Sequence, residues 1–288
     1  MRRVLHSVLV VFAILLAFLS FTPIEVEPVA WQAPPPPSTE SGLYARNDLL
    51  KAVERIGKDI GIGPEAVAFD AQGRITTGFA DGRVARFEPD GSGYTLVANT
   101  GGRPLGVSVH ADGSVIVCDA KKGLLRVDAS GTVSVLVAEA EGVPFRLTDD
   151  LAITNDGSKV YFTDASSKFG ANQVTEDIIE HGGHGRFMVY DFNSGKTDVL
   201  MSGLQFANGV ALGPDEAFVL VNETGSYRIL RYWLKGEKTG TSDVFVDNLP
   251  GFPDNITFNG KDRFWVAIYA PRTLGRRLCA PCSFCRPR

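Results

Sequence analysis

Residues 104–119, PLGVSVHADGSVIVCD, alternate apolar and polar side chains on both sides of a central Ala-Asp-Gly turn. Alternation with a period of two predicts β-strands, and the short glycine-containing turn predicts a hairpin between them. Four further segments have the same pattern: PEAVAFDAQGRITTGF (64–79), TDDLAITNDGSKVYFTD (148–164), ANGVALGPDEAFVLVN (207–222) and PDNITFNGKDRFWVAI (253–268). The chain is therefore predicted to contain a repeated β-hairpin unit.

The repeat extends beyond the hairpin. Three copies add a third strand, as in GRVARFEPDG, KGLLRVDASG and GRFMVYDFNSG, and a fourth strand often follows. Four short antiparallel strands that recur every roughly 40 to 60 residues are typical of β-propeller blades. We predict an all-β propeller over residues 45–271, with about four and a half blades present. An insertion at residues 168–183 is expected to form a loop between the second and third strands of its blade.

The N-terminal region differs in composition from the repeats. The residues MRR precede an apolar run at 4–21, which as a helix is about 27 Å long and just sufficient to cross a bilayer core. We favour an uncleaved signal anchor at 1–22 with a cytoplasmic N-terminus, and a cleaved signal peptide is the alternative. The domain is then expected on the lumenal side of the endomembrane system (ER or vacuole) or outside the cell, and secreted after cleavage. Residues 23–44 form a Pro-rich linker, in which Pro34–Pro37 are expected to act as a stiff spacer.

Charge and cysteine content exclude some classes of function. The formal net charge is −4, and basic residues form no stripe with interleaved aromatic residues, so nucleic acid is not an expected partner. The segment 272–288 has no strand pattern and carries Cys279, Cys282 and Cys285. Their spacing could suit zinc, but the segment lacks a fourth ligand. We interpret this atypical Cys/Arg-rich tail as the sign of a propeller truncated at its C-terminal side.

Alignment of the first strand of each repeat places Glu65, Leu105, Asp149, Asn208 and Asp254 at one position, at intervals of 40, 44, 59 and 46 residues. The first strand of each blade lines the central channel of a propeller, so these side chains are expected to converge. Three carboxylates in a narrow channel repel one another unless a cation or protons neutralise them. Carboxylate and amide oxygens suit Ca²⁺, and to a lesser degree Mg²⁺ or Mn²⁺, so the four polar residues are predicted metal ligands.

A structural interpretation of the same residues competes with the metal site. An isolated Asp or Asn at a strand entry commonly caps a turn through its side chain. This explanation requires the same coincidence in four repeats, and Leu105 shows that the position tolerates an apolar residue. The shared position therefore favours the metal site.

Several motifs carry a family resemblance in a consistent order. The segments GPEAVAFD, TDDLAITNDGSKVYFTD, HGRFMVYD, LQFANGVAL, YRILRYWLKG and LPGFPDNI resemble the strictosidine synthase-like family, which includes the adipocyte plasma membrane-associated proteins. That family is related to gluconolactonases and paraoxonases, and the resemblance implies a six-bladed β-propeller with a calcium site at Glu65, Asp149, Asn208 and Asp254. The hydrolase relatives usually carry Asn where this chain has Asp149, which adds a negative charge to the implied site.

The resemblance also implies a reaction, the metal-dependent hydrolysis of ester or lactone bonds in a small molecule. Asp254 or Asp149 could act as the base that activates water, and His184 is a further candidate. True strictosidine synthases use a glutamate in the sixth blade, which this chain lacks, so carbon–nitrogen condensation is an alternative without its key residue. A non-catalytic binding propeller is the other alternative. Two sequons begin at Asn222 and Asn255, and only Asn222 is expected to be accessible to glycosylation.

Overall fold

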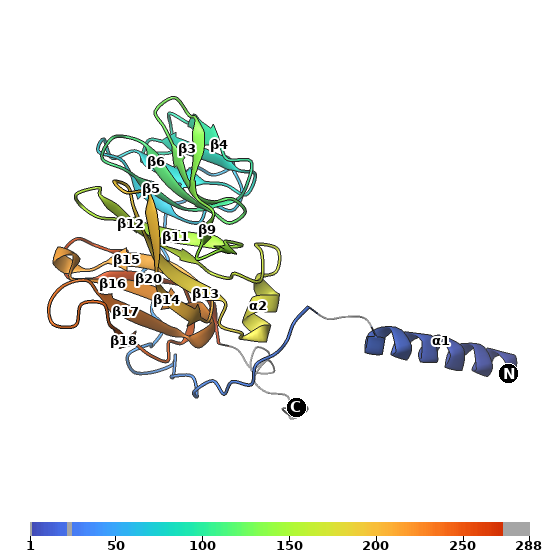
Figure 1. Cartoon of the computed structure of the whole chain (residues 1–288). Coiled ribbons are helices and arrows are strands. Elements are labelled where there is room, and N and C mark those ends of the chain that lie inside the picture. Colours follow the sequence, from blue (N-terminus) through green and yellow to red (C-terminus); the bar gives the residue numbers. More distant parts are fainter. Residues whose placement is uncertain (1, 22–24, 273–288) are drawn as a thin grey trace.

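The computed structural model describes residues 2–21 and 25–272 of the chain. Helix α1 (Arg2–Phe21) has 20 residues and lies apart from the β-sheets (Figure 1). Among the described residues, no helix has both the length and the apolar character needed to span a bilayer. The signal anchor therefore stays a prediction. The predicted tail with Cys279, Cys282 and Cys285 falls almost entirely in residues 273–288, which lie outside the described residues.

Most of the described chain folds into antiparallel β-sheets whose strands follow the sequence order. The first sheet contains β1 (Val67–Phe69), β2 (Ile75–Gly78), β3 (Arg83–Phe87) and β4 (Thr95–Asn99). The second contains β5 (Pro104–Val109), β6 (Val115–Asp119), β7 (Gly123–Val127) and β8 (Val133–Val137). The third contains β11 (Thr148–Ile153), β12 (Lys159–Asp164), β13 (Gly185–Asp191) and β14 (Lys196–Leu204). The fourth contains β15 (Ala207–Leu212), β16 (Phe218–Glu223), β17 (Arg228–Trp233) and β18 (Ser242–Val246).

Two smaller sheets complete the β-structure of the described residues. Strands β19 (Gly251–Phe258) and β20 (Phe264–Pro271) form a hairpin after the fourth sheet, and β9 (Glu139–Ala140) and β10 (Val143–Pro144) form a short hairpin after the second. The mostly β, propeller-like architecture and the repeated hairpin agree with the sequence analysis. The total of six blades stays a prediction.

Alternation along the second strand of each sheet explains how the sheets stack. On β6, Ile116 and Cys118 pack with Phe162 of the third sheet, whereas Val115 and Val117 pack toward the first sheet. Successive side chains of a strand point to opposite faces, so one strand with apolar residues at every position contributes to two cores. The first strands β1, β5, β11, β15 and β19 consequently lie beside one another in sequence order.

The insertion between β12 and β13 contains a helix, α2 (Val174–Glu180), where the sequence predicted a loop (Figure 1). Its position between the second and third strands of the sheet is as predicted. The helix ends at His181, whose φ of 54° is left-handed, and two glycines follow. The Pro-rich linker contacts the folded domain, because the Val29 N–H donates to the Glu180 carbonyl at 2.7 Å.

Candidate functional site

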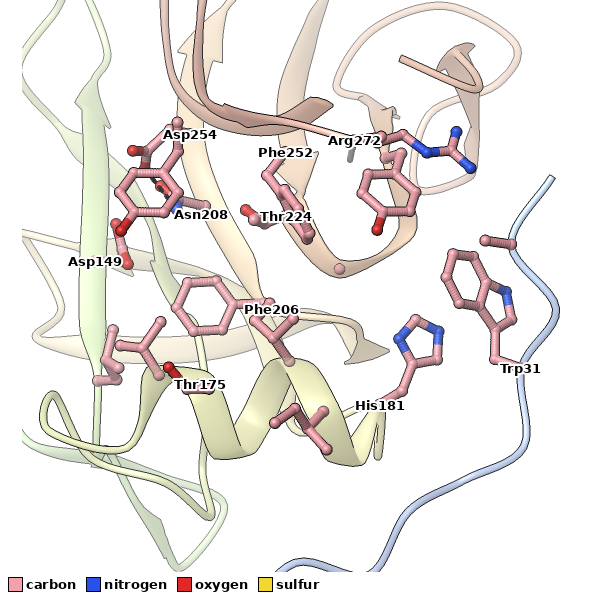
Figure 2. A pocket seen from close by; sticks show the side chains of 18 of the residues that line it. Trp31, Asp149, Thr175, His181, Phe206, Asn208, Thr224, Phe252, Asp254 and Arg272 are labelled. Carbon is pink, nitrogen blue, oxygen red and sulfur yellow. Dashed lines mark hydrogen bonds between the residues drawn. The ribbon is translucent and has the colours of Figure 1, made fainter. Parts of the chain in front are cut away.

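A cavity of about 1120 Å³ lies where the first strands, α2 and the N-terminal linker meet. All four predicted metal ligands line it. Figure 2 shows Asp149, Asn208 and Asp254 together at one end of the cavity, and Trp31 and His181 at the other. The four polar residues of the shared repeat position therefore line one cavity, as expected.

Local backbone irregularities at the repeat position present these side chains. The pairing of first and second strands shifts register between Thr148 and Leu151 in β11, between Ala207 and Val210 in β15, and likewise in β5 and β19. Each shift spans the residue that the sequence alignment placed at the shared position of the repeats. A β-bulge bends its strand and re-aims side chains, so the repeated bulge explains why these residues leave the sheet and enter the cavity.

A glycine next to the shared repeat position allows the neighbouring first strands β15 and β19 to approach closely. A Cβ on Gly209 would lie 2.5 Å from the carbonyl oxygen of Asp254 on the neighbouring first strand. Such a contact is too short for any side chain, so this position requires glycine. The close approach brings Asn208 within hydrogen-bond reach of Asp254, and the Asn208 Nδ2 donates to Asp254 Oδ1 at 2.8 Å.

The polar groups at this end of the cavity are incompletely paired. Asp149 and Asn208 are only 2% and 4% exposed. Within the described part of the chain, Asp149 Oδ1 and Asn208 Oδ1 have no hydrogen-bond partner. Within the described ranges 2–21 and 25–272, the cation that pairs with this group is Arg103, whose Nη2 lies 3.6 Å from Glu65 Oε2. Buried oxygens without donors are costly, which makes this end of the cavity a site prepared for a ligand.

The excess of negative charge is visible in the pKa values. Burial raises the pKa of Glu65 to about 7, with a further increase from the charge of Asp254 and an opposing effect of Arg103. Burial, followed by the charges of Glu65 and Asp254, raises the pKa of Asp149 well above its usual value. Burial also raises the pKa of Asp254, against the hydrogen bond from Asn208. Three carboxyl groups in one cavity therefore resist simultaneous ionisation.

A divalent cation fits the donor set of this cluster. The oxygens are hard donors, two of them are unpaired, and a cation would offset the mutual repulsion. Among the described residues, no three His, Cys, Asp or Glu side chains form a preassembled metal-binding group. A site here would consequently require the Asn208 amide oxygen together with the carboxylates. The four-residue ligand set stays a prediction.

The predicted catalytic histidine, His184, lies outside the cavity lining. Its Nε2 pairs with Glu180 Oε1 at 2.6 Å, and the Lys168 Nζ lies 2.7 Å from Glu180 Oε2. His184 therefore belongs to a charge-compensated cluster on the insertion. Its neighbour in sequence, His181, lines the cavity instead and stacks on Trp31 with ring centroids 4.2 Å apart.

Sequence reasoning missed two residues that support the site. Asp150 is buried beside Asp149, and its Oδ2 accepts a hydrogen bond from the Val210 N–H at 2.9 Å, which links β11 to β15. Asn222 is fully buried, and its Nδ2 donates to the carbonyl of Asp254. The expectation that Asn222 is an accessible glycosylation site is therefore wrong for the folded chain, and the residue fixes the strand that carries Asp254. In the sequence, the position of Asn222 as the last residue of the repeat segment 207–222 was the signal that could have indicated this role.

Comparisons of sequence identify relatives over most of the chain. Residues 149–237 match the strictosidine synthase family, and residues 42–87 match the N-terminal region of strictosidine synthase-like proteins. Strictosidine synthase-like protein 10 of Arabidopsis thaliana is 39% identical over 267 residues, which cover 83% of this chain and 71% of the relative. An adipocyte plasma membrane-associated protein of Salmo salar is 39% identical over 273 residues, covering 88% of this chain and 64% of the relative. The chain thus spans about two thirds of the length of these relatives.

Solved structures share the fold at low sequence identity. A gluconolactonase from Xanthomonas campestris superposes with a TM-score of 0.60 at 21% identity, over 72% of this chain and 70% of that chain. The calcium-binding protein regucalcin from Agrobacterium tumefaciens gives a TM-score of 0.58 at 19% identity, over 73% and 68% of the two chains. At these identities the likeness concerns the fold alone.

Proposed function

The chain belongs to the strictosidine synthase-like family, and from this premise we propose that it hydrolyses ester or lactone bonds of a small molecule with the help of a divalent cation, Ca²⁺ in the first place. The observation that carries the proposal is the gathering of Glu65, Asp149, Asn208 and Asp254 around one cavity, in which Asp149 Oδ1 and Asn208 Oδ1 are buried and have no hydrogen-bond partner among the described residues. A propeller related in fold to a gluconolactonase and to a calcium-binding protein supports the same reading.

The residues that would hold the cation are Glu65, Asp149, Asn208 and Asp254. When bound, the cation supplies Lewis-acid polarisation of the substrate carbonyl and offsets the charge that develops on its oxygen. The bulges of β11, β15 and β19 position Asp149, Asn208 and Asp254, and a hydrogen bond from Asn208 to Asp254 adds to this. Glu65 lies just before β1. The Asn222 side chain donates a hydrogen bond to the backbone carbonyl of Asp254 and so fixes the backbone there.

Asp254 and Asp149 are the proposed bases. Burial raises the pKa of both groups, and in its ionised form such a carboxylate accepts a proton from water more readily than an exposed carboxylate does. The apolar side chains of Leu105, Leu147 and Phe206 line the cavity beside these groups and exclude bulk water from them. His184 receives no role in this proposal, because it lies outside the cavity lining.

The location of this activity is part of the proposal. The relatives from Salmo salar and Gallus gallus bear the name adipocyte plasma membrane-associated protein. This name and the apolar segment at 4–21 support association with a membrane, with the propeller on the lumenal or extracytoplasmic side. Protease protection of the chain in sealed microsomes tests this placement, since a cytoplasmic propeller would be digested without detergent.

The central test measures cation binding and turnover on the same preparation. The full chain in lipid nanodiscs is stripped with a chelator and titrated with Ca²⁺ by calorimetry at constant ionic strength, and hydrolysis of phenyl acetate and of γ-butyrolactone is then followed. We expect saturable binding and cation-dependent hydrolysis, both lost in Glu65→Ala. Folded protein that neither binds Ca²⁺ nor hydrolyses either substrate would overturn the proposal in favour of a binding propeller.

A further inference from the structure

The N-terminal linker is fixed across the cavity mouth by hydrogen bonds at both ends. On one side, the N–H groups of Glu27 and Val29 donate to the side chain and the carbonyl of Glu180, both within 2.8 Å. On the other side, Asn248 Nδ2 donates to the Pro35 carbonyl at 2.8 Å. The linker therefore connects the end of α2 to the loop before β19.

Between these two attachments the linker supplies part of the cavity wall. Trp31 and the residues up to Pro36 line the cavity, although they precede the first β-strand by some thirty residues. The Trp31 ring stacks on the His181 ring with centroids 4.2 Å apart (Figure 2). Its centroid lies 5.8 Å from that of the Tyr227 ring. Prolines lose little conformational entropy on folding, so a Pro-rich segment is suited to hold this ring in place.

The two ends of the cavity differ in chemistry. The acidic groups gather at one end, the apolar side chains of Phe206 and Phe252 line the space between them and Trp31, and Arg272 lies at the Trp31 end with its guanidinium carbon 4.1 Å from the centroid of the Tyr227 ring (Figure 2). The volume of about 1120 Å³ exceeds what a small lactone fills, and cavities of about 300 to 1000 Å³ hold drug-sized ligands. A molecule that fills this space presents a polar group to the acidic end and an apolar body to the Trp31 end.

We propose that Trp31 of the N-terminal linker is a specificity-determining residue, which binds the apolar, ring-containing part of an ester or lactone substrate together with His181 and Tyr227. This inference rests on the proposed function for the reacting bond, but the binding of the apolar part does not depend on turnover. An aromatic ring offers both apolar contact area and stacking, and such contacts discriminate against substrates that lack a bulky apolar group.

Binding of a non-hydrolysable probe tests the proposal. The probe is 2-acetylnaphthalene, whose carbonyl cannot be hydrolysed, measured by calorimetry with the full chain in nanodiscs against empty nanodiscs. We expect Trp31→Ala to weaken binding about tenfold, on the scale of a lost aromatic contact. Trp31→Phe keeps a ring and is expected to restore most of the affinity. Trp265→Ala is the matched control, because Trp265 is 57% exposed and lies outside the cavity lining.

Hydrolysis separates this inference from the proposed function. In an active enzyme, Trp31→Ala should lower kcat/KM for 2-naphthyl acetate while methyl acetate changes less than about twofold. Trp31-dependent probe binding without any hydrolysis would support the subsite and overturn the hydrolase. Equal probe affinity of wild type and Trp31→Ala, or no binding by wild type, would overturn the subsite.

Discussion

Two buried acidic regions of this chain differ in how their charge is balanced. Glu180, at the end of α2, is 3% exposed in its side chain, nearly as buried as Asp149. It accepts hydrogen bonds from Lys168, His184 and the Glu27 N–H, and these outweigh burial so that its pKa is lowered. Burial and like charges instead raise the pKa of Asp149.

The difference separates a structural carboxylate from a binding one. At Glu180 the chain itself supplies the counter-charges, so the folded state is complete and the linker gains an anchor. In the cavity the chain brings three carboxyl groups together, and the ion pair described for them is that of Glu65 with Arg103, at 3.6 Å. Buried carboxyl groups that repel one another destabilise the folded chain, and such groups are typical of sites where a bound ligand offsets the repulsion. Burial of an acid alone therefore does not identify a functional site, and what distinguishes the cavity is that several carboxyl groups with little compensation gather around it.

The largest effect is expected from Asp254→Ala. The change removes a proposed ligand and the acceptor of the Asn208 amide. We expect loss of the Ca²⁺ binding heat and a decrease in kcat/KM of at least about 100-fold, equivalent to roughly 3 kcal/mol of transition-state stabilisation. Asp262→Ala is the matched control, because Asp262 is 69% exposed in a loop. Unchanged Ca²⁺ affinity in Asp254→Ala would remove the distinction between the two acidic regions.

Glu180→Ala tests the other side of the comparison. The substitution leaves Lys168 and His184 without their carboxylate and releases the Glu27 N–H. Glu180 is buried but Lys168 is 30% exposed in its side chain, so loss of these charge-assisted hydrogen bonds is expected to cost about 2 kcal/mol, which urea unfolding would detect. Ca²⁺ binding should stay as in wild type. Glu176→Ala, on the first turn of the same helix, serves as the control and should cost less than about 1 kcal/mol. A Glu180→Ala protein of normal stability but without Ca²⁺ binding would contradict our assignment.

Much of the fold was predictable because its determinants are local. The alternation in segments such as 104–119 specifies strands, and the shared position of Glu65, Asp149, Asn208 and Asp254 follows from repeat alignment alone. Blade architecture translates sequence register directly into spatial proximity. The proximity of these four residues could therefore be predicted from the sequence.

The rest depends on contacts that no local pattern encodes. Whether His181 or His184 faces the cavity is decided by the left-handed turn at His181 and by the hydrogen bond between His184 and Glu180. The position of Trp31 depends on hydrogen bonds to residues more than 100 positions away in sequence. Asn222 appeared accessible because a sequon reports nothing about burial. Long-range packing overrides local signals at these positions.

Asp177 on α2 gives an intermediate case with a pH signature. Burial raises its pKa to about 6, and its Oδ2 has no hydrogen-bond partner among the described residues. The folded state therefore prefers the protonated form, so stability falls as pH rises from about 4, the unfolded value, to about 6. Asp177→Asn removes this penalty and should stabilise the protein by about 2 kcal/mol at pH 7, with little change at pH 3.5. Urea unfolding at both pH values would contradict this if the variant were less stable than wild type at pH 7.

Of the two substitutions at proposed cation ligands, Asp149→Asn is expected to have the smaller effect on cation binding, because it removes a charge and keeps an oxygen donor. Because the carboxyl group of Asp149 is buried against Glu65 and Asp254, a neutral amide there lowers the repulsion in the cation-free state. We therefore expect a higher Tm without Ca²⁺, by roughly 2 to 4 °C for each kcal/mol gained. Ca²⁺ affinity should fall by less than about tenfold, since one of three negative charges is lost but the ligand oxygen remains. The increase in Tm on addition of Ca²⁺ then becomes smaller, because the Tm without Ca²⁺ is higher. A loss of binding as complete as in Asp254→Ala would mean that charge, and not the oxygen donor, is what Asp149 contributes.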